Sequence, residues 1–382
     1  MKINCATAPL KKSIAVVLAL CMAVLPLLNC GGGSSLSSPG TNSPPPPPPG
    51  VTWTTTCNFT VILAAKGSDT ICTYVINGES ITRSVLFHPG THYVAGNAAV
   101  MYLHSSCGGM QEFKGPNQQW DVMANQNNFL VVSPLGAAPQ PNPGACKWNS
   151  WWTPWDTIPP PDDGVFMRAL LIDVSTRLGA DPKRRFLTGY SAGSNLISRI
   201  LVQDGDLLTA VAVVEGHLTG FDDLDTLCGS TVPCTGKFIP PMPTPVNVMI
   251  IRGENGAMRI CSSNSHESTV DEEFTYYTAQ NRTTTVMPNT NKFCPSATRG
   301  STAGTETWKK ATGGTNGTVV KIFELLGGGH QWYASNLCSA TGVHNSQFAV
   351  EFPNACPVAN GGNGGTGFEN AIVYEFFMQS SH

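Results

Sequence analysis

The segment "FLTGYSAGSNL", residues 186–196, is where the fold of this chain can first be predicted. An apolar run typical of a strand leads into a serine between two glycines, and the residues that follow favour a helix. Gly189, Ser191 and Gly193 therefore occupy a strand-to-helix turn, which is the setting of the G-x-S-x-G nucleophile elbow. The flanking glycines permit a tight turn that projects the Ser191 hydroxyl, and the helix N-terminus behind it offers backbone N–H groups to a developing oxyanion. We predict that Ser191 is a nucleophile.

Strand-like and helix-like runs alternate along the rest of the chain. Short apolar runs bounded by Gly, Pro or Asn predict strands at 82–89, 97–104, 128–134, 184–190, 209–216, 246–253 and 318–326. Apolar residues at intervals of four predict a helix over 162–179, and further helix-like segments cover 192–203 and 268–280. The expected class is α/β: an α/β-hydrolase fold with a mostly parallel central sheet flanked by helices.

The first fifty residues predict export rather than a folded domain. Lysines precede a short apolar run, so residues 1–30 resemble a signal peptide, and "LLNCGGGSS" resembles a lipobox with Cys30 as the lipidated residue. The Gly/Ser/Pro-rich segment 31–50 predicts a tether, which leaves 51–382 as one catalytic domain. A net charge of −3 with 12% charged residues gives no reason to expect a nucleic-acid partner. We expect a monomer at the cell surface or outer membrane, or a freely secreted one, with membrane contact only through the lipid.

Cysteine usage agrees with export. Ten of the 13 cysteines lie after the tether, and an even number in an exported chain predicts disulfides rather than a metal site. Pairing nearest neighbours gives Cys57–Cys72, Cys107–Cys146, Cys228–Cys234, Cys261–Cys294 and Cys338–Cys356. We expect no metal, because no paired metal-ligand spacing occurs.

A general base is predicted near the C-terminus. His330 follows the strand-like run 318–326 and three glycines that can form its loop. A serine hydroxyl needs an imidazole to accept its proton before it becomes a good nucleophile. His330 is therefore the candidate base for Ser191.

With "LTGYSAG" and "GGGHQW", the chain resembles the secreted polyhydroxybutyrate depolymerases and the feruloyl or acetylxylan esterases among the α/β-hydrolases. The similarity extends to "AVMYLHSSCGG" and "CKWNSWW" and covers roughly 83–332. Ser105 stands where the family has a glycine after the oxyanion-loop histidine. The resemblance implies that Ser105 or Ser106 supplies one oxyanion donor and Ala192 the other.

The resemblance leaves the acid open. The family takes its carboxylate from a His-Gly-x-x-Asp segment, and here Gly256 stands in the place of the aspartate. Glu254 is the first candidate to orient His330. Asp222 or Asp223 could reach it from the neighbouring strand, and Asp271 is a further option.

A serine esterase without a cofactor is the expected function. Clustered aromatic residues suggest an apolar cleft for a polymer or an aromatic acyl group, with candidate substrate-binding residues Tyr190, Trp148, Trp151, Trp152 and Trp332. Polyhydroxyalkanoate-type polyester or its oligomers is the favoured substrate. Feruloyl or acetylxylan esters are the alternative, and a non-catalytic surface binding lipoprotein is the rival from another class.

Overall fold

A computed structural model describes the chain over most of the predicted catalytic domain. The described residues lie within one compact unit, Ser43–His382. They are 52–76, 82–106, 108–137, 148, 162–218, 241–256, 261, 268–288, 293, 308–325, 327–333, 347–355 and 369–381.

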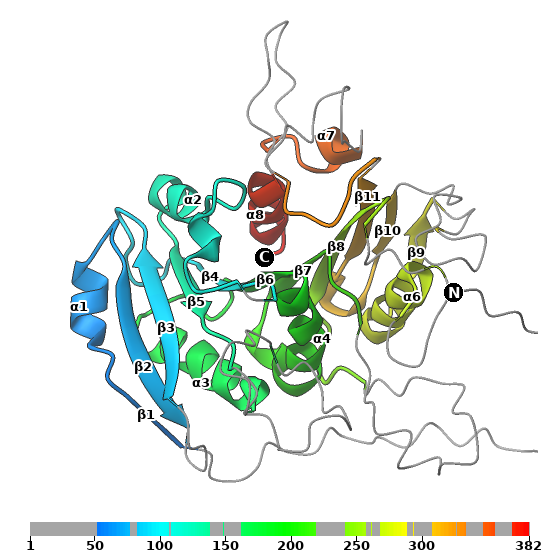
Figure 1. The fold of residues 1–382 in the computed structure, drawn as a ribbon. Coiled ribbons are helices and arrows are strands. Elements are labelled where there is room, and N and C mark those ends of the chain that lie inside the picture. Colours follow the sequence, from blue (N-terminus) through cyan, green and yellow to red (C-terminus); the bar gives the residue numbers. More distant parts are fainter. Residues whose placement is uncertain are drawn as a thin grey trace, which may run out of the picture. The chain divides into compact units, whose positions relative to one another are not determined.

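The described residues form an eleven-stranded sheet in the order β1-β2-β3-β5-β4-β6-β7-β8-β11-β10-β9 (Figure 1). The six central strands, β5, β4, β6, β7, β8 and β11, are parallel, and the strands at both sides pair antiparallel. Their bounds are β1 Trp53–Thr55, β2 Thr70–Ile76, β3 Thr82–Pro89, β4 Ala99–Leu103, β5 Leu130–Pro134, β6 Arg185–Tyr190, β7 Ala210–Val214, β8 Asn247–Gly253, β9 Thr285–Met287, β10 Trp308–Thr312 and β11 Val320–Leu325.

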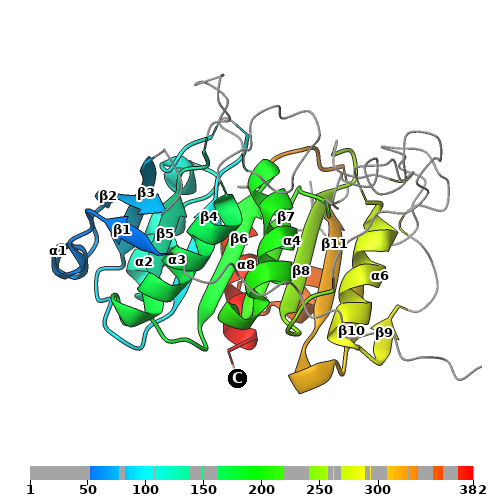
Figure 2. The same cartoon turned by 90° about the horizontal axis from the view of Figure 1, so that it is seen from below.

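Helices cover both faces of this sheet. The helices are α1 Phe59–Ala64, α2 Trp120–Asn127, α3 Asp163–Thr176, α4 Ala192–Asp204, α6 Val270–Asn281, α7 Gln347–Glu351 and α8 Glu369–Gln379. Buried side chains of α3, α4 and α6 share a core cluster with alternate residues of the strands, and those of α2 and α8 share a second cluster with the residues between them. Figure 2 shows α3, α4 and α6 on one side, with α8 behind the sheet. Side chains alternate along a strand, so each buried strand supplies both cores. This is an α/β-hydrolase fold.

The predicted strands and helices are confirmed. All seven strand-like runs are strands of the sheet, and the helix-like segments correspond to α3, α4 and α6. Strands β1, β2, β9 and β10 lie outside the parallel centre and are not among the predicted runs. β1 and β9 have only three residues each, and in β2 and β10 the polar residues Thr73, Lys309 and Lys310 interrupt the apolar residues, so all four strands lack the continuous apolar run of a doubly buried strand.

One predicted disulfide is confirmed, since Cys57 and Cys72 are bonded. Cys261 is also disulfide-bonded, and its predicted partner Cys294 lies outside the described residues. Each of the other three predicted pairs, Cys107–Cys146, Cys228–Cys234 and Cys338–Cys356, lies there too, as do the signal peptide, Cys30 and the tether. In the described part of the chain, no helix is long and apolar enough to cross a membrane.

Candidate active site

Ser191 lies in a strained turn between β6 and α4. Its backbone has φ 55° and ψ −119°, a conformation that a residue with a side chain rarely adopts. The Ser191 N–H donates to the Val214 carbonyl at 3.0 Å, which ties the turn to β7. A Cβ at Gly193 would lie 2.3 Å from the Leu103 carbonyl oxygen, so only glycine lets α4 begin this close to β4. The predicted turn is thus present, with the Ser191 side chain at the carboxyl end of the parallel strands.

His330 lies within hydrogen-bond distance of Ser191. Its Nε2 is 2.9 Å from Ser191 Oγ. The Tyr190 ring stacks on the imidazole at 5.3 Å between centroids, and the Tyr190 hydroxyl donates to the His330 carbonyl at 2.9 Å. Burial, with help from nearby carboxylates, raises the pKa of Tyr190, so its phenol keeps its proton. Tyr190, a candidate substrate-binding residue, therefore contacts the candidate base in this structure.

The carboxylate beside His330 belongs to Glu215. This residue follows β7 directly, is fully buried, and has a positive φ of 50°. Its Oε2 is 3.4 Å from His330 Nδ1, while its Oε1 accepts a hydrogen bond from the Gly253 N–H. A carboxylate at Nδ1 favours the tautomer with the proton on that nitrogen, which leaves Nε2 free to accept the Ser191 proton. Ser191, His330 and Glu215 are thus placed in sequence as the candidate nucleophile, base and acid.

Glu254 has another partner. Its Oε2 accepts the Gly327 N–H at 2.8 Å, and its own N–H donates to the Leu325 carbonyl at 3.0 Å. It thereby holds the start of the glycine loop that carries His330, and no contact to the imidazole is present.

Within the described residues, none of the other acid candidates lies beside His330. Asp271 lies on α6, where it accepts the Phe293 N–H and pairs with Lys309. Asp222 and Asp223 fall outside the described residues. Glu215 is not among the acids predicted from the sequence, although it directly follows the buried run "AVAVV" of residues 210–214.

The predicted oxyanion loop follows β4. Buried His104 braces it, because its Nε2 accepts the Gly136 N–H at 2.9 Å and its Nδ1 lies 2.7 Å from the Ser105 carbonyl. A nitrogen that accepts from an N–H carries no proton, so the proton is on Nδ1. Burial lowers the pKa of His104, which favours this neutral form. Ser105 and Ser106 follow, and Ala192 is the first residue of α4.

The two described tryptophans among the candidate substrate-binding residues are buried. The Trp148 indole N–H donates to the His104 carbonyl at 2.7 Å, and its ring lies against the imidazole. Trp332 is 1% exposed and packs edge-to-face against Tyr102. Both brace loops around the site and offer no free face to a substrate. Trp151 and Trp152 lie outside the described residues.

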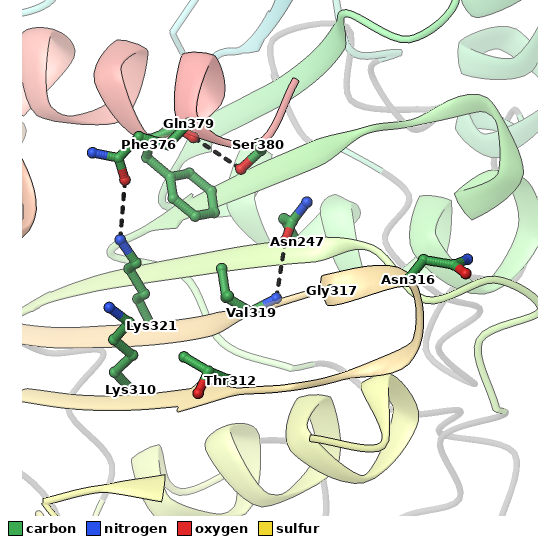
Figure 3. A pocket seen from close by; sticks show the side chains of 10 residues that line it. All are labelled: Asn247, Lys310, Thr312, Asn316, Gly317, Val319, Lys321, Phe376, Gln379 and Ser380. Carbon is green, nitrogen blue, oxygen red and sulfur yellow. Dashed lines mark hydrogen bonds between the residues drawn. The ribbon is translucent and has the colours of Figure 1, made fainter. Parts of the chain in front are cut away.

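A cavity of about 400 Å³ lies at the amino end of β8 and β11, at the opposite end of the parallel strands from Ser191. Figure 3 shows the residues that line it. Asn247, Lys310, Lys321 and Phe376 are among its lining residues. Both lysines pair with Glu351, and Lys321 also lies over the Phe376 ring. Among the described residues no group of His, Cys, Asp or Glu could hold a metal ion, here or elsewhere.

Comparisons with known proteins give distant relatives. No protein-family model matches this chain. The oxidized polyvinyl alcohol hydrolase of Sphingopyxis sp. (strain 113P3) is 28% identical over 143 residues, which is 32% of this chain and 38% of that protein. A poly(3-hydroxybutyrate) depolymerase, LpqC from Bordetella parapertussis, aligns over 71% of this chain and 88% of its own with 12% identity and a TM-score of 0.46. An acetyl xylan esterase from Aspergillus awamori aligns over 73% and 94%, with 13% identity and a TM-score of 0.41.

Proposed function

We propose that this chain is a serine hydrolase of carboxylic esters, with Ser191 as nucleophile, His330 as base and Glu215 as acid. The observation that carries the proposal is the chain of contacts from Ser191 Oγ through the imidazole to a buried carboxylate. The strained backbone at Ser191 supports it, because such strain concentrates at functional sites.

The chemistry follows from this geometry. His330 Nε2 accepts the hydroxyl proton as Ser191 Oγ attacks the ester carbonyl, and the N–H of Ala192 with one from the 105–106 loop holds the oxyanion. The tetrahedral intermediate collapses, and the alcohol leaves with the proton from His330. Water then gives a proton to His330 and attacks the acyl-serine. His330 returns this proton to Ser191 Oγ as the carboxylic acid leaves, and Ser191 is restored. The Glu215 carboxylate stabilises the imidazolium that forms on His330.

For the substrate we propose polyhydroxyalkanoate-type polyesters or their oligomers. The resemblance of "LTGYSAG" and "GGGHQW" to the depolymerase and esterase group supports an ester, while feruloyl and acetylxylan esters remain alternatives. Oxidised polyvinyl alcohol is a second candidate, because the Sphingopyxis relative is a hydrolase of that polymer.

The proposal includes export and an anchor at Cys30, on the strength of the apolar run and the Cys-Gly-Gly-Gly segment that follows it. Replacement of Cys30 by serine should release the protein from the membrane fraction if lipid alone holds it there.

The test is product release by residues 51–382 from four substrates in parallel: amorphous polyhydroxybutyrate, oxidised polyvinyl alcohol, methyl ferulate and acetylxylan. We expect hydroxybutyrate release by the wild type and none by Ser191→Ala. A fluorophosphonate probe should label the wild type and leave the Ser191→Ala variant unlabelled. Folded wild type that neither labels nor turns over any ester would favour the binding lipoprotein.

A further inference from the structure

The backbone of Ser105 is fully engaged within the loop that follows β4. Its N–H points at the Glu112 carboxylate, 3.0 Å from Oε1 and 3.2 Å from Oε2, and its hydroxyl donates to Oε2 at 2.7 Å. Its carbonyl accepts the Gly108 N–H at 3.0 Å and faces His104 Nδ1 at 2.7 Å. The Ser105 N–H is therefore not available to an oxyanion.

Glu112 is the centre around which this loop folds. It begins the 3₁₀ helix Glu112–Lys114, and its Oε1 also accepts the Tyr102 hydroxyl at 2.8 Å. Burial raises the pKa of Tyr102 well above its ordinary value, with Glu112 adding to the effect, so the phenol remains a donor. A Cβ at Gly108 would lie 1.9 Å from Glu112 Oε2, so the chain at Gly108 fits closely against the carboxylate.

The register of the sheet brings this loop to Ser191. Leu103 of β4 lies opposite Gly189 of β6, so two residues further along the parallel strands Ser105 comes level with Ser191. Ser106 is exposed, and its N–H donates to none of the described residues.

We propose that Glu112 is the positioning residue of the oxyanion loop and that the Ser106 N–H is the loop's donor. By holding Ser105, the carboxylate fixes the direction of the next peptide unit, so that the Ser106 N–H and the Ala192 N–H converge on one oxygen. The donors on Glu112 from Tyr102 and Ser105 disperse its charge, which limits repulsion of an oxyanion nearby. This inference rests on the proposed ester hydrolysis at Ser191.

Four variants test the role of Glu112 with a soluble p-nitrophenyl ester. Glu112→Ala should lower kcat about 10- to 100-fold with KM within about two-fold, because an oxyanion donor acts in the transition state and its full loss costs about 10²- to 10³-fold. Gly108→Ala should reproduce this loss, since its methyl group displaces the carboxylate. Glu112→Gln, which keeps an acceptor for Ser105, should retain most of the rate. Ser105→Ala is the matched control that removes only the hydroxyl contact.

An alkylboronic acid distinguishes positioning from a structural role. It forms a tetrahedral adduct with the serine that places an oxygen in the oxyanion site. Its inhibition constant should therefore rise in Glu112→Ala in parallel with the loss of kcat/KM, when both are measured well below the Tm of the variant. Wild-type kcat in Glu112→Ala would overturn the proposal. An unchanged boronate affinity, or a Gln variant as impaired as Ala, would overturn it as well.

Hydrogen exchange tests the loop independently of turnover. The Ser105 amide should be protected in the wild type and lose protection in Glu112→Ala, while the Ser106 amide exchanges fast in both. Equal exchange of the two amides in the wild type would overturn the proposal even if no ester were hydrolysed. Failure of the proposed function would instead appear as wild type without turnover, boronate binding or fluorophosphonate labelling.

Discussion

Replacement of Glu215 by glutamine should disable the enzyme, whereas the same change at Glu254 should not. The imidazolium that forms on His330 faces the Glu215 carboxylate at 3.4 Å, and Coulomb's law with an effective dielectric constant of about 20 gives an attraction of about 5 kcal/mol. Loss of that stabilisation in the transition state corresponds to a fall in kcat of about 10³- to 10⁴-fold. The Gln side chain keeps the volume and can still accept the Gly253 N–H, so the fold should persist.

The assay is kcat and KM for a p-nitrophenyl ester at pH 8, with active sites counted by fluorophosphonate and Tm measured for each variant. Glu254→Gln is the matched control, because its amide oxygen can still accept the Gly327 N–H. We expect kcat of Glu254→Gln to remain within about three-fold of the wild-type value, because the hydrogen bond to the Gly327 N–H is kept. A Glu215→Gln enzyme within ten-fold of wild type, or an equal loss in Glu254→Gln, would refute the assignment of the acid.

Three further predictions concern stability. Burial raises the pKa of Asp204 from 3.8 to about 6 despite its pair with Arg168, so its contribution is greatest at low pH and is lost as pH rises through this range. The free energy of unfolding of Asp204→Asn, measured with urea, should therefore rise relative to that of the wild type by up to about 3 kcal/mol between pH 4 and pH 8. A difference between the two proteins that does not change with pH would contradict this. Because burial lowers the pKa of His104, wild-type stability should fall as pH drops below 6.5, and His104→Gln should lessen that slope in the same assay. Joint replacement of Cys57 and Cys72 by alanine opens a loop with a separation of 15 residues and should cost about 3 kcal/mol by guanidinium unfolding, whereas a loss below about 1 kcal/mol would be too small for this crosslink.

The fold could be predicted from the sequence because its centre is made of doubly buried parallel strands. Runs such as "VNVMIIRG" have no polar face, so they stand out against helices and loops. The outer strands could not be predicted in this way. In β10, "WKKAT", the Lys310 side chain is accommodated by its ion pair with Glu351, a partner 41 residues away that local sequence does not reveal.

The tryptophans show a second kind of limit. Trp148 and Trp332 lie next to the predicted catalytic loops in sequence, and this position predicts a substrate cleft. Composition cannot tell whether such a ring faces solvent or a neighbouring side chain. Here Trp148 lies against His104 and Trp332 against Tyr102, so both hold loops in place from within.

Ser191 and His330 could be located because each is recognised from its own strand and turn, but the acid depends on two neighbouring strands. Val214 of β7 lies opposite Ile251 of β8, so the loops after these strands open toward the same imidazole. A Cβ at Gly256, in the loop after β8, would lie 2.7 Å from Glu215 Oε2. The carboxylate of Glu215 thus occupies the space that a side chain at position 256 would enter. In the loop after β8, the expected aspartate is missing from the motif. The position beside His330 is instead filled by Glu215, which follows β7. Gly256 leaves the space that the Glu215 carboxylate occupies.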